Sequence, residues 1–125
     1  MKKLLKSLLL LCLMTPLLSF NLFKINICNA TWYDTTPYPT VHRVHSTAAI
    51  SRNLIRNMNL TVGDKFKDIK GSFLIVKNLY NNNIDTVEIT DVCGNVNHID
   101  LSKKSFGKLD NHGRGRIKVV VKKYI

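Results

Sequence analysis

The sequence predicts a small, mainly β domain, and three observations lead to this fold class. Short runs of β-branched and other apolar residues alternate with turns rich in Gly and Asn, no internal repeat is present, and only two segments carry a helix-start signal. Short strands with frequent turns are typical of a small barrel, in which closure removes the exposed sheet edges. We therefore expect a six-stranded β-barrel with one or two short helices.

The first 30 residues have the layout of a secretory signal peptide. Lysines come first, and an apolar stretch runs to Phe20. Cys28-Asn29-Ala30 then places small residues at the third and first positions before a cleavage point. An uncleaved anchor is the alternative, although the apolar stretch is shorter than the roughly 20 residues of a membrane span. We predict cleavage after Ala30, which leaves one exported domain, 31–125, with no stable membrane span.

The charge of the chain favours an anionic partner. The net charge is +11 at pH 7, and four lysines and no acid precede the predicted cut, so the predicted domain carries +7. An exported basic protein meets anionic cell-wall polymers rather than nucleic acid.

Of the three cysteines only Cys93 follows the cut, which excludes an internal disulfide in the predicted mature chain. We expect a monomer, located in the periplasm, at the cell wall or outside the cell.

The first half of the domain begins with an aromatic strand. Ala30–Asp34 predicts this strand, and Pro37 and Pro39 place a loop after it. The small, apolar segment Thr47–Ile50 suits a tight, buried position. Ser51 is expected to cap a helix with apolar residues on one face, namely Leu54, Ile55 and Met58.

The second half shows clearer patterns. Phe73–Val76 reads as a buried strand, 78–83 as a turn, and 84–90 as an alternating strand in which Asp85 is tolerated at a sheet edge. Ser102 is expected to cap a helix over Lys103–Leu109. Gly113 and Gly115 open a loop before the closing strand, which spans Ile117–Val121.

Two carboxylates stand out as candidate site residues. Asp91 ends a β-branched run, and Asp100 follows nine positions later, just before Leu101-Ser102. A carboxylate at such a place either accepts backbone N–H bonds or faces a groove. Asp91 is our first candidate, whereas Asp100 also suits a structural role at the helix start.

Aromatic and acidic residues near the start of the domain are further candidates. Trp32 and Tyr33 are suited to stacking on sugar rings, and because neighbours in a strand face opposite sides, we expect one of them to belong to the core. Asp34 is a candidate second carboxylate.

Histidine and cysteine supply the remaining candidates. His42 or His45 is a possible proton partner of Asp91, and His98 is a candidate substrate-binding residue. No acid or thiol lies close to His42 and His45 in the sequence, so we predict no metal site and no cofactor. Cys93 is interpreted as a small buried thiol rather than a nucleophile, because no activating base is evident.

Four segments, in order and at fitting distances, resemble the double-psi β-barrel of the rare lipoprotein A and expansin-like group. They are Ala30-Thr31-Trp32-Tyr33-Asp34, Lys77-Asn78-Leu79, Val87-Glu88-Ile89-Thr90-Asp91, and Ile99-Asp100-Leu101-Ser102-Lys103-Lys104-Ser105-Phe106. The ending Gly115-Arg116-Ile117-Lys118-Val119 is similar to the last strand of that group. The resemblance covers nearly all of 31–125, and 51–69 has the character of an insertion.

The resemblance implies a protein that acts on cell-wall polysaccharide. Some bacterial members are lytic transglycosylases, in which the Asp that matches Asp91 is the key acid, and expansins loosen walls without hydrolysis. This chain has Ile50 where enzymatic members carry a His, no acid between Asp34 and Asp64, and Val92-Cys93-Gly94 in place of Arg-Gly-Pro. Three hypotheses stay open: a lytic transglycosylase of peptidoglycan, a non-catalytic wall-binding module, and a secreted effector or inhibitor built on the barrel.

Overall fold

The computed structural model describes residues 25–34, 45–60 and 69–124 of the 125-residue chain. The predicted leader up to residue 24, the proline-containing loop, His42 and residues 61–68 of the expected insertion lie outside the described residues. The elements are β1 (Asn26–Tyr33), β2 (Thr47–Ile50), α3 (Arg52–Asn57), β3 (Phe73–Asn78), β4 (Ile84–Val92), β5 (His98–Ser102), α4 (Lys103–Leu109), the 3-10 turn η2 (His112–Arg114) and β6 (Ile117–Lys123).

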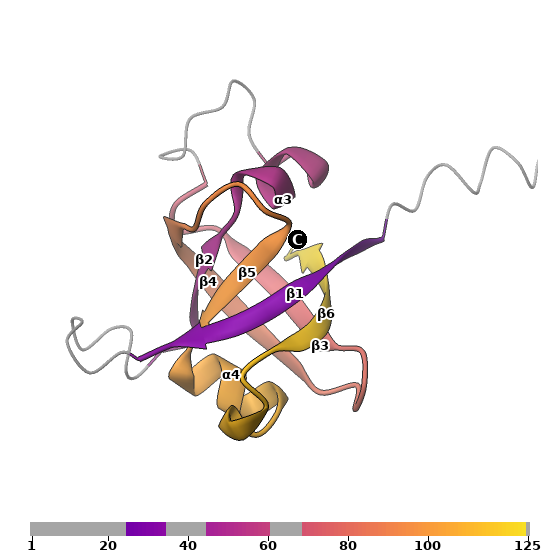
Figure 1. Ribbon diagram of the computed structural model, residues 1–125. Coiled ribbons are helices and arrows are strands. Elements are labelled where there is room, and N and C mark those ends of the chain that lie inside the picture. Colours follow the sequence, from indigo (N-terminus) through magenta and orange to yellow (C-terminus); the bar gives the residue numbers. More distant parts are fainter. Residues whose placement is uncertain (1–24, 35–44, 61–68, 125) are drawn as a thin grey trace, which may run out of the picture.

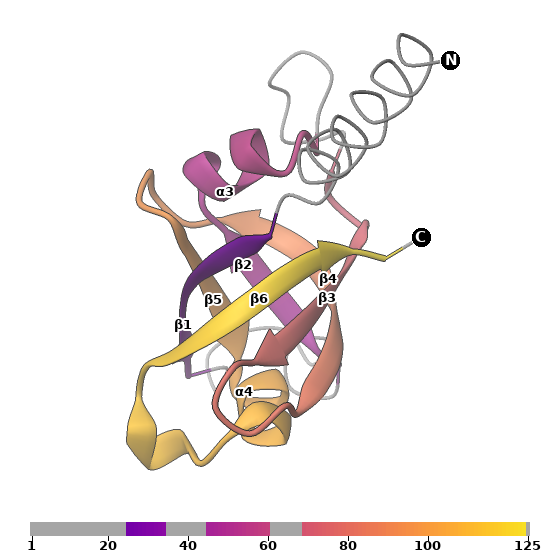
Figure 2. The same cartoon turned by 90° about the vertical axis from the view of Figure 1, so that its right-hand side faces the viewer.

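Six strands close into a barrel in the order β1-β5-β2-β4-β3-β6 (Figure 1). β1 and β5 run parallel, as do β2 and β4, and the other neighbours are antiparallel. Figure 2 shows α3 at one end of the barrel and α4 at the other. The predicted class, a mainly β six-stranded barrel with two short helices, is confirmed.

Both helices begin where the sequence predicts. Ser51 Oγ accepts a hydrogen bond from the Leu54 N–H at the start of α3, and Ser102 Oγ accepts one from the Ser105 N–H at the start of α4. A serine at this position satisfies an N–H group that has no partner inside the helix. None of the helices in the described part of the chain is long and apolar enough to cross a membrane.

Apolar side chains from all six strands fill the barrel, and both helices extend this core. Phe106 of α4 is the largest fully buried side chain, and Leu54 of α3 is buried beside the other end of the barrel. The strand residues alternate between core and surface, as a two-residue period requires. In β4, Val87 and Ile89 are fully buried, and Glu88 between them is not.

Asp85 corrects one prediction, because a closed barrel has no edge for it. β4 is flanked by β2 and β3, and Asp85 is only 9% exposed. Lys108 of α4 lies 3.3 Å from Asp85 Oδ1 and also donates to Ser46 Oγ at 3.2 Å. A buried carboxylate is costly unless it is paired, so this contact holds α4 against β4.

The Asn-rich turn between β3 and β4 is tied to the end of α4. The carbonyl of Leu109 has no partner inside the helix, and it accepts side-chain N–H bonds from Asn78, Asn81 and Asn83 at 3.0, 2.8 and 3.3 Å. Asn78 is fully buried, and its Oδ1 accepts the backbone N–H of Tyr80 at 2.9 Å. The asparagines therefore fix the hairpin to the helix.

β1 begins before the predicted cleavage point. Its first five residues, 26–30, pair with β6, and Cys28 and Ala30 are buried in the core. A cut after Ala30 would remove this half of the strand and open the barrel between β1 and β6. The leader itself stays a prediction, but an intact barrel requires the cut to fall before Asn26. Cys28 then stays in the domain as a free thiol, as Cys93 does.

We predict that a chain beginning at Ile25 folds cooperatively, whereas a chain beginning at Thr31 does not. The shorter chain lacks the strand half that pairs with β6 and two core side chains. Thermal unfolding followed by circular dichroism distinguishes the two chains. A cooperative transition of the Thr31 chain at a similar temperature would contradict the role given to residues 26–30.

Candidate functional site

The barrel register places two carboxylates in one row across four neighbouring strands. Asp100 of β5 pairs with Thr31 of β1 on one side and with Ala49 of β2 on the other. Ala49 in turn pairs with Asp91 of β4. Neighbouring strands lie about 4.8 Å apart, so the Cα atoms of Asp91 and Asp100 are roughly 10 Å apart with Ala49 between them.

A bulge in β4 lets Asp91 join this row. Ala48 pairs with Ile89, but Ala49 pairs with Asp91, so Thr90 is an extra residue in this strand pair. Ile89 points into the core, and strict alternation from it would also turn Asp91 inward. The extra residue resets the alternation, and Asp91 is exposed.

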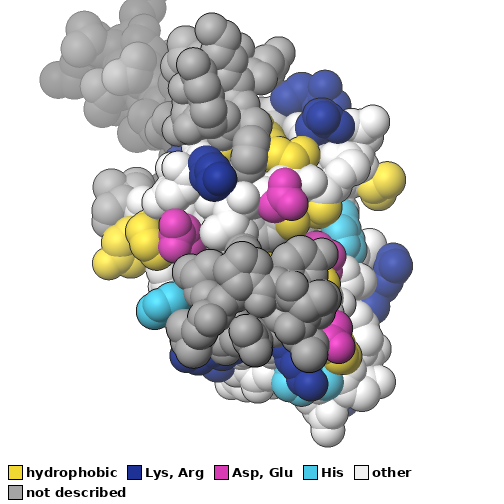
Figure 3. All heavy atoms as spheres, turned by 90° about the vertical axis from the view of Figure 1, so that its left-hand side faces the viewer, with side chains coloured by type: hydrophobic (Ala, Val, Ile, Leu, Met, Phe, Trp, Pro, Cys, Tyr) yellow, Lys and Arg dark blue, Asp and Glu magenta, His cyan; other side chains and the backbone are white. Residues whose placement is uncertain are grey.

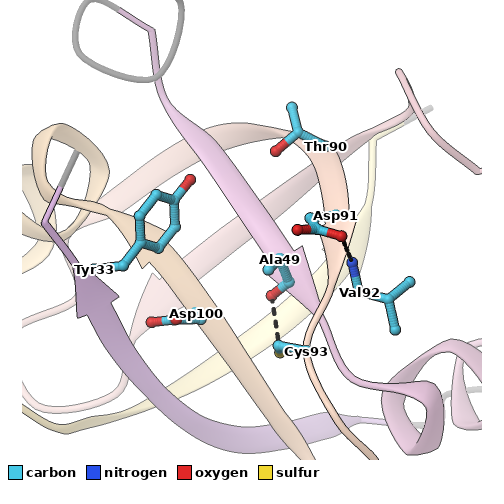
Figure 4. A pocket seen from close by; sticks show the side chains of 7 residues that line it. All are labelled: Tyr33, Ala49, Thr90, Asp91, Val92, Cys93 and Asp100. Carbon is cyan, nitrogen blue, oxygen red and sulfur yellow. Dashed lines mark hydrogen bonds between the residues drawn. The ribbon is translucent and has the colours of Figure 1, made fainter. Parts of the chain in front are cut away.

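Three residues of this row, Asp91, Ala49 and Asp100, line an open cavity of about 300 Å³. Its lining comprises Tyr33, Ala49, Thr90, Asp91, Val92, Cys93 and Asp100 (Figure 4). The small Ala49 side chain leaves space between the two carboxylates. Figure 3 shows Asp and Glu side chains at several separate places on one face of the molecule, which also carries Lys, Arg and His side chains. The structure therefore brings the two sequence-predicted carboxylates together.

Asp91 and Asp100 are held in different ways. Asp91 Oδ1 accepts the N–H of Val92 at 2.7 Å, so one carboxylate oxygen is occupied by the backbone next to it. Asp100 Oδ1 accepts the hydroxyl of Thr31 at 2.8 Å, a contact from a neighbouring strand. The sequence pattern did not indicate Thr31, because only the parallel pairing of β1 with β5 brings it to Asp100.

His98 extends the hydrogen bond between Thr31 and Asp100. Its Nε2 lies 2.8 Å from Thr31 Oγ1. A hydroxyl has one proton, and the Asp100 carboxylate accepts it, so His98 must donate from Nε2. Burial lowers the pKa of His98 below its ordinary value, Asp100 opposes this shift, and Arg116 adds to it. A neutral His98 with its proton on Nε2 therefore supports Thr31 and, through it, Asp100.

Tyr33 and Trp32 lie on opposite sides of β1, as their alternation predicts. Tyr33 lines the cavity, and its hydroxyl lies 2.9 Å from Thr47 Oγ1. Trp32 packs against the core beside Phe106 and donates from Nε1 to the carbonyl of His112 at 3.1 Å. This packing keeps Trp32 out of the cavity, so its predicted contact with substrate is not supported.

The other predicted site residues lie apart from the cavity. Asp34 is exposed at the end of β1 and is not part of the lining. His45 is exposed, and its backbone carbonyl accepts a bond from Ser102 Oγ at 3.4 Å. His98 contacts the site through Thr31 rather than from the lining. No group of three or more potential metal ligands is found among the residues that the structure describes.

Cys93 lies in the cavity as a thiol. Its Sγ donates to the carbonyl of Ala49 at 3.3 Å. Burial, reinforced by the charges of Asp100 and Asp91, raises the pKa of Cys93 to about 11. The nucleophilic form of cysteine is the thiolate, so Cys93 is unsuited to nucleophilic attack at neutral pH. The sequence predicts a small buried thiol at Cys93, and the structure places it half-buried in the lining of the cavity.

Neither a protein-family model nor a curated protein sequence matches the chain significantly, but solved structures do. The apo form of an expansin from Clavibacter michiganensis matches with a TM-score of 0.62 and 21% identity over 82% of this chain. A variant of this expansin in complex with cellohexaose matches with a TM-score of 0.61, 19% identity and the same coverage. This chain spans about half, 51%, of the length of these expansins.

A third structural match is a Streptomyces papain inhibitor. It has a TM-score of 0.55 and 21% identity, and the match covers 78% of this chain and 94% of the inhibitor. Likenesses at this level of identity concern the fold. The fold of this chain is an expansin-like double-psi β-barrel.

The lowered pKa of His98 makes the stability of the barrel depend on pH. Because the folded protein disfavours the imidazolium, His98 stabilises the fold above its ordinary pKa of 6.5, and this contribution is lost as pH falls below that value. As pH falls through this range, the free energy of unfolding measured with denaturant should decrease less for His98→Gln than for wild type. Arg116→Gln should also reduce the decrease, because it removes a charge that lowers the pKa. Unchanged pH profiles in both variants would contradict this account.

Proposed function

We propose that this chain is an exported module that binds cell-wall polysaccharide in the cavity between Asp91 and Asp100. The observation that carries the proposal is the row of two carboxylates separated by the small side chain of Ala49. Carboxylates accept short, charge-assisted hydrogen bonds, and sugar hydroxyls donate them. A spacing of roughly 10 Å between the Cα atoms leaves room for a sugar ring above Ala49.

Two further features of the cavity suit a sugar. Tyr33 offers a ring that is fixed by its contact with Thr47 and is only partly buried, which suits packing against the apolar face of a sugar. Two successive hydrogen bonds, from Nε2–H of His98 to the Thr31 hydroxyl and from that hydroxyl to Asp100, orient one carboxylate before the ligand arrives. Preorganised polar groups in a largely formed pocket are typical of small-ligand sites. The solved complex of a structurally similar expansin with cellohexaose supports the same ligand class.

Lytic cleavage of peptidoglycan glycan strands is the second candidate function. Cleavage requires a proton donor at the glycosidic oxygen, and a transglycosylase uses the hydroxyl of the sugar itself as the nucleophile. Asp91 is exposed in the cavity, whereas Asp100 accepts the Thr31 hydroxyl, so Asp91 is the candidate acid. An inhibitor function is a third candidate, because the chain spans 94% of the Streptomyces papain inhibitor.

Filling the cavity floor tests polysaccharide binding. Ala49→Leu places a larger side chain between Asp91 and Asp100, and because Ala49 faces outward, the core stays unchanged. We expect the affinity for cellohexaose or for isolated peptidoglycan strands to fall at least about tenfold in calorimetric titrations, which corresponds to about 1.4 kcal/mol. Thr86→Leu, an exposed position of β4 outside the cavity, is the matched control. Equal affinities of wild type and Ala49→Leu would exclude this cavity as the binding site.

Asp91→Asn separates a lytic enzyme from a binding module. The amide keeps the shape of the carboxylate but cannot deliver a proton. If wild type releases anhydro-sugar products from peptidoglycan strands, the variant should lose the roughly 10²–10⁴-fold that general acid catalysis contributes, while it still binds the strands. Mass spectrometry of the products provides the measurement. Persistent cleavage by Asp91→Asn would rule out Asp91 as the acid. If wild type cleaves no strands, the lytic function is excluded and the binding module remains.

A further inference from the structure

A second cavity lies where the β3–β4 hairpin meets the start of β6. Its volume is about 380 Å³, and it shares no lining residue with the cavity of Asp91 and Asp100. The hairpin contributes Asn78–Tyr80, and the chain around the start of β6 contributes Arg116–Lys118. Figure 2 shows these two segments next to each other at the α4 end of the barrel, and the Leu79 N–H donates to the carbonyl of Lys118 at 3.0 Å.

The second cavity is positively charged. Arg114, Arg116 and Lys118 line it together with one acid, Asp110. Asp110 is already engaged, since it accepts bonds from Asn78 at 3.1 Å and from its neighbouring backbone N–H, and it pairs with Arg114 at 3.4 Å. Within the described part of the chain, neither Arg116 nor Lys118 forms an ion pair, and both are exposed. Two cations therefore remain available to a ligand.

An aromatic ring stands beside these cations on a rigid support. Tyr80 is 80% exposed, and the guanidinium of Arg114 lies 5.1 Å from the centre of its ring. The backbone N–H of Tyr80 is held by Asn78, whose own side chain is fully buried and bonded to the end of α4. A large exposed ring on an immobilised turn loses little conformational freedom when a ligand covers it.

We propose that this second cavity binds an acidic saccharide, with the sugar ring packed on Tyr80 and its carboxylate held by Arg116 and Lys118. A guanidinium matches the planar carboxylate with two parallel hydrogen bonds, and Lys118 adds a second charge. This inference goes beyond the proposed function and does not depend on it, because the second cavity has its own residues.

Arg116 lines the second cavity and also acts on His98, which contacts the first cavity through Thr31. Ile117, the residue after it, pairs with Ala30 of β1, and the charge of Arg116 reaches His98 and lowers its pKa. A carboxylate bound at Arg116 neutralises that charge, so the pKa of His98 should rise when the second cavity is occupied. NMR titration of the His98 imidazole therefore distinguishes binding at Arg116, which should raise the pKa of His98, from binding at a distant surface, which should not.

The experiment compares a hexamer of galacturonate with cellohexaose, a neutral hexasaccharide. We expect the full chain to bind the uronate hexamer more tightly, with affinity that weakens as salt screens the charges. Arg116→Gln combined with Lys118→Gln should reduce this affinity at least about tenfold, as expected for the loss of charge-assisted hydrogen bonds. Lys70→Gln combined with Lys122→Gln removes the same charge from exposed positions elsewhere and should leave the affinity within about twofold.

Single variants of aromatic residues test the stacking contact. Tyr80→Ala should weaken uronate binding about fivefold or more, whereas Tyr124→Ala, an exposed tyrosine beside Phe73, should not. Ala49→Leu should leave uronate binding intact, even if the polysaccharide site proposed above fails its own test. Three outcomes would each overturn the inference. Wild type fails to bind the uronate hexamer, the charge-matched control loses as much affinity as the Arg116 and Lys118 double variant, or Ala49→Leu loses uronate binding.

Discussion

The candidate site depends on one irregularity in strand pairing, the register shift between Ala48 and Ala49. In a closed barrel each strand residue faces either the core or the outside, and one inserted residue exchanges the two. Thr90 is that residue in β4, and it turns Asp91 away from the core that buries Ile89. Asp91 therefore faces Asp100 across Ala49. Without this bulge, strict alternation would turn Asp91 toward the core, where a carboxylate is costly unless it is paired.

The sequence predicted the local features of this fold well because each depends on neighbouring residues. The caps Ser51 and Ser102, the alternation of β4 and the opposite faces of Trp32 and Tyr33 are signals that a short window contains. The row across β1, β5, β2 and β4 is not such a signal. It joins positions up to 69 residues apart, and only the pairing of these four strands, parallel for β1 with β5 and β2 with β4 and antiparallel for β2 with β5, brings them together.

Two sequence patterns show that a short-range signal can serve more than one purpose. Small residues around Ala30 match a cleavage signal, but small side chains at alternate positions also suit the crowded core of β1. Asp85 suits an exposed edge, but barrel closure leaves no edge and Lys108 becomes its partner. Even the abundance of asparagine has a structural use, since three of these side chains satisfy the last carbonyl of α4.

Net charge describes this protein less well than the placement of its charges. The chain carries +11, yet the cavity of Asp91 and Asp100 is lined by two acids and no cation, while the cavity beside Tyr80 is lined by three cations and one engaged acid. Charges separated by more than about 8–10 Å are largely screened at physiological salt, so each cavity presents its own local field. Sugar hydroxyls suit the first field and a sugar carboxylate suits the second. A wall polymer longer than the hexamers used as probes, and carrying both groups, can therefore contact one barrel at two places, and its combined attachment exceeds either contact alone where the polymer spans both cavities.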